Sequence, residues 1–338
     1  MTMGPIAATR FGAPLLPGGT IGVCAPSGPV YNASDLLRCK EWVESKGYRV
    51  VLSDGVWAKD DYEAGSPEQR ARDLEALFAD PEVDVIHALW GGTGAIRVLP
   101  HLDYDLIAAN PKALMGYSDI TNLHVALLRR SGLAGLHGPG FGSMGIPERT
   151  AFTWDSAFAA FTDGGVGPVP DDPDDPYRRT IVGGSVTSPI VGGNLFTLVH
   201  LIGTPFEPSF DGAILFFEEV HTPAYVLEIH LNHLAMAGKL DGVVGVVVGE
   251  LKDCDWSEER PEAPRNRSIE EALERTLAPL GVPVLYRLPL GHGKHLASIP
   301  LGVTATLDAD ARTLRIEQPG VVAHAYHQQE NVMEGGTR

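Results

Sequence analysis

The chain has 338 residues, of which 44% are hydrophobic and 20% are charged, and this composition is typical of a soluble globular protein rather than a disordered or fibrous one. It carries 43 acidic residues against 26 Lys and Arg, a formal net charge of -17 at pH 7. Because nucleic acids and anionic membranes attract Lys and Arg, this negative charge argues against both as general partners. The length of the chain favours two domains.

Three cysteines, Cys24, Cys39 and Cys254, lie far apart in the chain and form no CxxC pair. This pattern argues against a disulfide framework and a zinc ribbon, and it indicates a reducing compartment. Residues 1–17 hold no apolar core long enough for a secretory signal, and no run approaches the roughly 18 apolar residues of a membrane span. We therefore expect a cytoplasmic protein.

The first half of the chain alternates short apolar runs with longer amphipathic ones, which is the pattern of an α/β domain with a parallel sheet. Ser66 can cap the helix that follows it, Pro67 suits the first helical position and Gln69 completes a capping box. The expected strands are residues 20–25, 48–52, 83–89 and 112–115, and the expected helices are residues 34–46, a segment starting at 66, a segment around 96–99 and residues 120–130.

The composition changes around residues 151–179, where Gly164-Gly165 and the acidic, Pro-rich run 171–176 indicate a linker or a long surface loop. Calcium binding by the acidic run is the alternative, but its prolines and the lack of EF-hand spacing favour a solvated loop. The expected organisation is an N-terminal domain at 1–160, a linker at 161–185 and a C-terminal domain at 186–338. In the last, the expected strands are 213–217, 242–248, 284–288 and 303–307, and the expected helices are 225–237 and 268–280.

The best candidate for chemistry is Ser118, in the sequence Gly116-Tyr117-Ser118-Asp119. An expected buried strand ends at Gly116 and a helix begins near Ile120, so Ser118 would project from a sharp turn above the sheet edge, at the positive end of the helix dipole. The amide of Asp119 is then a natural oxyanion donor. The alternative is that Ser118 or Asp119 simply caps the helix.

A second candidate is the segment Trp90-Gly91-Gly92-Thr93-Gly94, which also joins an expected strand to an expected helix. Glycines let the backbone approach a ligand and point amides into a site, so this segment could complete an oxyanion hole. It lacks the GxGxxG order and the Lys of phosphate loops, and a tight turn is the alternative.

Two later segments offer the partners that a serine nucleophile needs. Glu218 and Glu219 end an apolar strand, where functional sites collect in α/β sheets, although an exposed acid pair at a helix start is the alternative. His292 lies in the Gly-flanked loop 291–295 and could project into a cleft, although a lone loop His is usually only a surface residue. A Ser, a carboxylate and a His can form a catalytic triad in any chain order.

Two further histidines, His230 and His233, have a spacing close to that of a metal-binding pair. However, Glu228 is not placed as in the HExxH motif, and no third ligand is suggested. We interpret both as helix-face residues and expect neither a metal nor a cofactor.

Several short blocks in a fixed order carry a family resemblance: residues 25–28 (Ala-Pro-Ser-Gly), 91–94, 99–103, 116–121, 137–139 (His-Gly-Pro), 192–195, 215–219, 291–292 and 300–302. Through them the sequence resembles, from about Gly18 to Asp308, the LD-carboxypeptidases (muramoyltetrapeptide carboxypeptidases). This family of serine peptidases also includes the microcin C self-immunity peptidases.

The resemblance implies an N-terminal α/β domain that bears the nucleophile and a C-terminal domain of mixed β and α structure that supplies the acid and the base. By motif position it implies Ser118 as nucleophile, Glu218 as carboxylate and His292 as base. The implied oxyanion hole consists of the amides of Gly92 and Asp119. A homodimer is expected at the level of the family.

Within the same motifs, Glu219 and His295 are neighbours of the matching residues rather than matches. Two departures put the substrate in doubt: Trp90 stands where many carboxypeptidase members have Arg, and the loop 293–299 lacks the Thr and Pro that we associate with the family. Both could line the substrate pocket.

The activity implied by the resemblance is hydrolysis of the amide between an L-configured centre and the terminal D-amino acid of a murein tetrapeptide, during peptidoglycan recycling. One alternative is an amidase that acts on peptidyl or aminoacyl nucleotides, like the microcin-immunity branch, although Pro223-Ala224-Tyr225 after the acid looks more like the carboxypeptidase branch. The other is a catalytically silent member that binds a peptide. The expected partner is a small peptide or peptidyl substrate, with no nucleic acid and no membrane.

Overall fold

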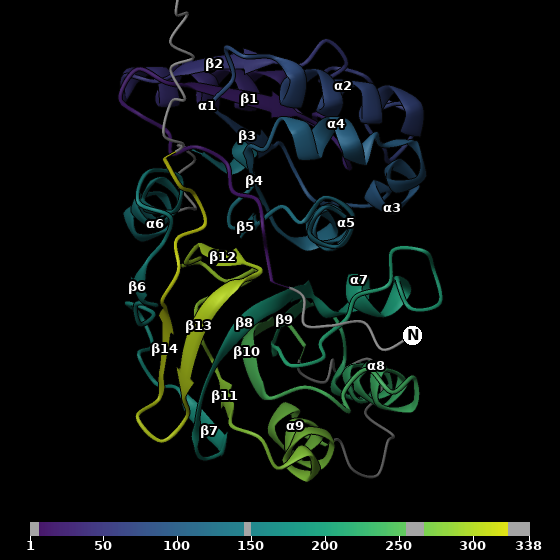
Figure 1. The fold of residues 1–338 in the computed structure, drawn as a ribbon, viewed down its shortest axis with the longest axis vertical. Coiled ribbons are helices and arrows are strands. Elements are labelled where there is room, and N and C mark those ends of the chain that lie inside the picture. Colours follow the sequence, from purple (N-terminus) through teal and green to yellow (C-terminus); the bar gives the residue numbers. More distant parts are fainter. Residues whose placement is uncertain (1–6, 145–149, 255–266, 324–338) are drawn as a thin grey trace, which may run out of the picture.

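A computed structural model describes residues 7–144, 150–254 and 267–323, which form a mixed α/β fold around two sheets (Figure 1). The first sheet runs in the order β12 (Ile299–Leu301), β5 (Gly135–His137), β4 (Ala113–Gly116), β3 (Val85–Ala88), β1 (Thr20–Cys24) and β2 (Arg49–Leu52). All of these pairs are parallel except that of β12 with β5. The parallel α/β pattern expected of the first half is therefore confirmed.

Helices accompany the strands of the first sheet nearly where the hydrophobic periodicity predicts them. They are α1 (Ala33–Ser45), α2 (Pro67–Ala79), α3 (Ala95–Val98), α4 (Tyr104–Ala109), α5 (Thr121–Ser131) and α6 (Ala151–Thr162), of which α4 and α6 were not predicted. Ser66 caps α2 by accepting a hydrogen bond from the amide of Gln69 at 3.2 Å. The expected capping box is wrong, because the Gln69 side chain donates to Asp73 at 2.8 Å instead.

The second sheet runs in the order β6 (Gly167–Pro168), β14 (Thr313–Ile316), β13 (Val303–Asp308), β8 (Ser185–Asn194), β9 (Ile214–Val220), β10 (Gly245–Lys252), β11 (Val284–Tyr286) and β7 (Arg179–Val182). Its four central strands, β8 to β11, are parallel, and the outer strands are antiparallel to their neighbours. Residues 161–185, expected to form a linker, supply both edge strands of this sheet, so that expectation was wrong. Helices α7 (Leu195–His200), α8 (Ala224–Met236) and α9 (Ile269–Leu277) flank the sheet (Figure 1).

The chain crosses between the two sheets more than once. Strand β12 comes from the C-terminal part of the chain but pairs with β5, where Ile299 lies opposite His137. The amide of Leu296, just before β12, donates to Thr153 of α6 at 3.0 Å. The segment that follows β11 is thus anchored in the N-terminal half.

The acidic run 171–176 is an exposed loop, as expected, and three of its carboxylates form ion pairs. Asp174 lies 2.6 Å from Lys294, Asp175 lies 2.5 Å from Arg287, and Asp171 lies 3.0 Å from Arg178. In the part of the chain that the structure describes, no group of three or more His, Cys, Asp or Glu side chains could hold a metal ion. Nor is any of the described helices long and apolar enough to cross a membrane.

Candidate active site

Ser118 occupies a strained turn directly after β4. Its φ is +60°, a left-handed conformation that is uncommon for a residue other than Gly and is often found at functional sites. The tightness of the turn explains Gly116, because a Cβ there would lie 2.8 Å from Cγ2 of Ile120. In the described structure neither Ser118 nor Asp119 provides a side-chain cap for α5, so the capping alternative is wrong.

The segment between β3 and α3 lies against Ser118. A Cβ on Gly91 would be 2.8 Å from Ser118 Cβ and 3.1 Å from Ser118 Oγ, so a side chain at this position would collide with the hydroxyl-bearing residue. Gly92 has a φ of +108°, which favours glycine. The amide of Gly28 donates to Gly91 O at 3.0 Å and ties the segment to the loop after β1.

Glu218 and His292 form a direct pair. Nδ1 of His292 lies 2.7 Å from Oε2 of Glu218, at the end of β9, and the Glu218 side chain is fully buried. A carboxylate on Nδ1 fixes the imidazole tautomer and leaves Nε2 as the nitrogen that can exchange a proton with a hydroxyl. The acid and the His, 74 residues apart in the chain, are thus brought together.

The His292 ring also reaches the turn that carries Ser118. Its centroid lies 4.7 Å from the ring centroid of Tyr117, the residue before Ser118. The pair of His292 and Glu218 therefore lies beside Tyr117, the residue that precedes Ser118.

Gly291 allows the close contact between His292 and Glu218. Its φ is +132°, and a Cβ there would lie 2.6 Å from Oε2 of Glu218. Gly291→Ala should lower kcat about 10- to 100-fold, because a methyl group would displace the carboxylate or the imidazole from its productive position. Steady-state kinetics would measure the change.

The matched control for this substitution is Gly281→Ala. Gly281 also has a positive φ, +66°, but a Cβ there would have no atom within 4 Å, so it adds backbone strain without touching the site. The control should keep kcat within twofold of the wild-type value. Unchanged kcat in Gly291→Ala would contradict the expected role of this glycine.

Glu219 has a different environment from its neighbour. Its Oε2 accepts a hydrogen bond from the amide of Phe196 at 2.8 Å, and its Oε1 accepts from Asn194 Nδ2 at 3.2 Å and from the Val220 amide at 2.9 Å. These contacts hold the start of α7. Burial raises the pKa of Glu219 above its ordinary value. Both glutamates are buried in β9, so the alternative of an exposed acid pair at a helix start is wrong.

The remaining histidine candidates have partners of their own. Nδ1 of His295 lies 2.9 Å from Thr150 Oγ1, and its Nε2 lies 3.2 Å from Asp174 Oδ2. The ring of His230 packs edge-on against Phe196 with 5.9 Å between centroids. His295 thus belongs to the contacts that hold the loop, and His230 lies on the face of α8 that meets α7.

Sequence reasoning gave no role to two buried histidines beneath the turn. His124 donates from Nε2 to the carbonyl of Gly116 at 3.0 Å, and burial lowers its pKa to about 4. His137 lies edge-on to Tyr117 at 6.2 Å and to Phe216 at 4.9 Å, and burial likewise lowers its pKa. Both rings are therefore neutral at pH 7. The only sequence signal was the His-Gly-Pro block at 137–139.

Comparison with known proteins gives matches along most of the chain. Residues 21–138 match the LD-carboxypeptidase N-terminal domain, and residues 187–307 match the LD-carboxypeptidase C-terminal domain. A Bacillus subtilis protein named "Probable murein peptide carboxypeptidase" is 30% identical over 315 residues, which cover 89% of this chain and 92% of that protein.

Solved structures share the fold. An active-site mutant of the microcin C7 self-immunity protein MccF, in the apo state, has a TM-score of 0.83 at 26% identity, covering 93% of this chain and 100% of the other. A further structure of MccF is a complex with aspartyl sulfamoyl adenosine. Muramoyltetrapeptide carboxypeptidase from Oxalobacter formigenes has a TM-score of 0.76 at 29% identity, covering 88% of this chain and 97% of the other.

Proposed function

Because the chain belongs to the LD-carboxypeptidase family, whose two domain models match both of its halves, we propose that it is a serine peptidase that releases the terminal D-amino acid from murein tetrapeptides. The observation that carries the proposal is the 2.7 Å contact between His292 and the buried Glu218, beside the strained turn of Ser118. This arrangement fits a nucleophile, a base and an orienting acid.

In the proposed reaction, Nε2 of His292 takes the proton of the Ser118 hydroxyl as Oγ attacks the carbonyl carbon of the scissile amide. The carbonyl π electrons move to oxygen, and the amides of Gly92 and Asp119 bind the oxyanion, a contribution of about 3–4 kcal/mol in comparable sites. The protonated His292 then gives its proton to the leaving amine as the C–N bond breaks. Throughout, Glu218 stabilises the charged imidazole.

Deacylation repeats the sequence with water as the nucleophile. His292 takes a proton from water, the hydroxide adds to the acyl carbon, and collapse of the intermediate breaks the bond to Ser118 Oγ. The serine regains its proton from His292, and the shortened peptide leaves with a new carboxylate. All bonds made and broken in the proposed reaction involve the peptide, water, Ser118 and His292, while Glu218 and the two backbone amides stabilise charge.

Trp90 is a candidate wall of the substrate pocket. It precedes the glycines that contact Ser118, and its indole lies on the backbone of Gly142, where a Cβ would be only 2.4 Å from the ring. The indole therefore replaces a cationic side chain at this position with an apolar surface. This difference bears on which peptide is preferred, and it leaves the catalytic residues unchanged.

The alternative activity is hydrolysis of aminoacyl or peptidyl nucleotide amides. The specific observation in its favour is the similarity to MccF, with a TM-score of 0.83. Both activities break an amide through an acyl-enzyme, so the same three residues would serve either. Only the substrate pocket would differ.

A substrate comparison distinguishes the two. The purified protein, incubated with a murein tetrapeptide ending in D-alanine and separately with aspartyl sulfamoyl adenosine, should release D-alanine with a kcat/KM at least about tenfold higher than that for the nucleotide conjugate. Mass spectrometry identifies which amide breaks. The control is the tetrapeptide ending in L-alanine, which should be cleaved poorly. Cleavage of only the nucleotide conjugate would support the alternative, and cleavage of neither would contradict the proposed function.

A further inference from the structure

The two proposed oxyanion donors, the amides of Gly92 and Asp119, belong to segments that are far apart in the sequence. Gly92 lies in a segment with two left-handed glycines, since φ is +108° at Gly92 and +110° at Gly94. The helix that follows, α3, has only four residues and receives no side-chain cap from Gly94. Such a segment needs contacts from elsewhere to keep one conformation.

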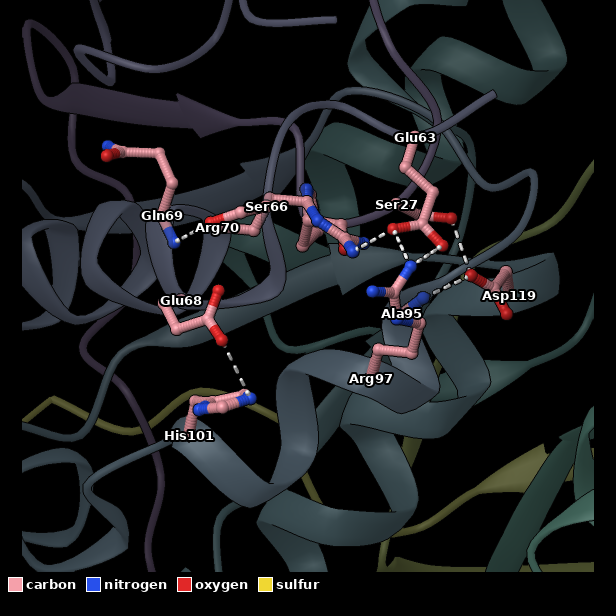
Figure 2. Close-up of polar contacts among 11 residues, drawn as sticks. Ser27, Glu63, Ser66, Glu68, Gln69, Arg70, Ala95, Arg97, His101 and Asp119 are labelled. Carbon is pink, nitrogen blue, oxygen red and sulfur yellow. Dashed lines mark hydrogen bonds and ion pairs between the residues drawn. The ribbon is translucent and has the colours of Figure 1, made fainter. Parts of the chain in front are cut away.

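The carboxylate of Asp119 supplies such a contact (Figure 2). Its Oδ2 accepts a hydrogen bond from the amide of Ala95, the first residue of α3, at 2.8 Å. The same oxygen accepts from the hydroxyl of Ser27, in the loop after β1, at 2.5 Å. Its Oδ1 accepts from Asn122 Nδ2 at 2.8 Å. One carboxylate thus joins the serine turn, the glycine segment and the loop after β1.

The loop after β1 completes the contact from the other side. Ser27 is fully buried, and the amide of Gly28, next to it, donates to Gly91 O at 3.0 Å. A Cβ on Gly28 would lie 2.8 Å from that carbonyl oxygen, so the two backbones are in direct contact. Asp119 holds the Ser27 hydroxyl, and the backbone of Ser27 and Gly28 is the segment that Gly91 and Gly92 contact. The hydrogen bond between Asp119 and Ser27 therefore fixes the position of that segment.

A buried ion pair stands behind this arrangement and fixes the far end of α3 (Figure 2). Glu63 is paired with the buried Arg70 and with Arg97, whose Nη1 lies 3.0 Å from both carboxylate oxygens. Arg70 also donates to the carbonyl of Pro26 at 3.0 Å. Because the Glu63 carboxylate fills the space beside Gly94, where a Cβ would lie 2.6 Å from it, the glycine segment has no room to shift in that direction.

We propose that the Asp119 carboxylate and Ser27 are positioning residues, which hold the Gly91–Gly94 segment so that the Gly92 amide stays in the oxyanion hole. Asp119 then has two tasks: its amide is one donor, and its carboxylate fixes the segment that carries the other. The inference rests on the proposed function, because the hole acts only if an oxyanion forms on a substrate of Ser118.

The test uses Asp119→Ala and Ser27→Ala, both of which keep the backbone amides. We expect Asp119→Ala to lower kcat about 100-fold and Ser27→Ala about tenfold, with KM within twofold of the wild-type value, because the hole acts on the transition state. Asp119→Asn should recover kcat to within about tenfold of wild type, since its oxygen can still accept from Ala95 and Ser27. Amide hydrogen exchange in residues 90–95 should become about tenfold faster in both alanine variants.

The matched control is Asp103→Ala, because Asp103 caps α4 in the same half of the chain by accepting from the amides of Asp105 and Leu106 at 3.0 and 2.9 Å. It should leave kcat and exchange in residues 90–95 unchanged. The inference is overturned if Asp119→Ala keeps kcat within twofold of wild type, if exchange in residues 90–95 does not change, or if Asp103→Ala has the same effects. If the wild-type protein cleaves neither substrate, the proposed function fails, while the exchange measurement still decides whether Asp119 holds the segment.

Discussion

Ser118→Ala should reduce kcat by about 10⁴-fold or more, because the variant keeps the turn but has no oxygen to form the acyl-enzyme. Substrate binding is expected to survive, so the peptide should still be bound with an affinity close to the wild-type value. The measurement is the rate of D-alanine release together with the dissociation constant from calorimetry. Thermal unfolding of the variant verifies that the fold is kept.

Ser118→Gly is the informative companion of this substitution. Both variants lack the hydroxyl, but only glycine adopts a φ of +60° without cost, so Ser118→Gly should unfold at a higher temperature than Ser118→Ala. Full activity in either variant would refute the proposed nucleophile. A wild-type protein as inactive as Ser118→Ala would instead support the reading of a peptide-binding family member without catalysis.

The sequence predicts β1, β3 and β4 well because these strands are buried along their whole length and read as continuous apolar runs. Strand β8 was missed for the opposite reason. It contains Pro189, Gly192 and Gly193, residues that normally indicate a loop. The structure needs Gly192 in the strand, since φ is +147° there and a Cβ would lie 1.7 Å from the carbonyl oxygen of Phe216. Because β8 lies so close to β9 at this point, it has glycine where a strand would normally have an apolar residue.

Pairings between distant segments were equally beyond prediction. Nothing local indicates that residues 299–301 leave the second half of the chain and pair with β5, because a strand's partner depends on the completed fold. Likewise, Gln69 fits a capping box by its spacing, but its amide finds a better-placed acceptor in Asp73. The pairing of β12 with β5 depends on tertiary contacts. The missing capping box at Gln69 results from competition between neighbouring side chains.

The candidate site was predicted at the level of residue types and chain order, which the family motifs of Ser118, Glu218 and His292 carry. Its supporting contacts were not predicted. Asp119 was expected to contribute its amide or to cap α5, and no pattern links its carboxylate to Ser27, 92 residues away. Hydrogen bonds of this kind depend on how three loops meet at one sheet edge, and sequence spacing does not encode that meeting.

We expect Glu218→Gln to lower catalytic activity and Glu219→Gln to lower stability, although the two residues are adjacent in the sequence. In Glu218→Gln, the side-chain amide of the glutamine can donate to Nδ1 of His292, which favours the imidazole tautomer with its proton on Nε2. Because that tautomer cannot accept the proton of the Ser118 hydroxyl, kcat should fall by about 10³–10⁴-fold. At position 219 the change removes one acceptor from the start of α7, so kcat should stay within a few fold while the free energy of unfolding falls by about 1–2 kcal/mol.

If the two substitutions had the opposite effects on activity, Glu219 rather than Glu218 would be the acid of the proposed triad. If Glu219→Gln lost turnover and Glu218→Gln kept it, the 2.7 Å contact between Glu218 and His292 would be structural only, and Glu219 would have to reach the imidazole by rearrangement of β9. The two residues point to opposite faces of the same strand, so such a rearrangement would also remove the carboxylate that accepts from the Phe196 amide in α7. A normal unfolding temperature in Glu219→Gln, with activity lost, is therefore the result that the present geometry does not permit.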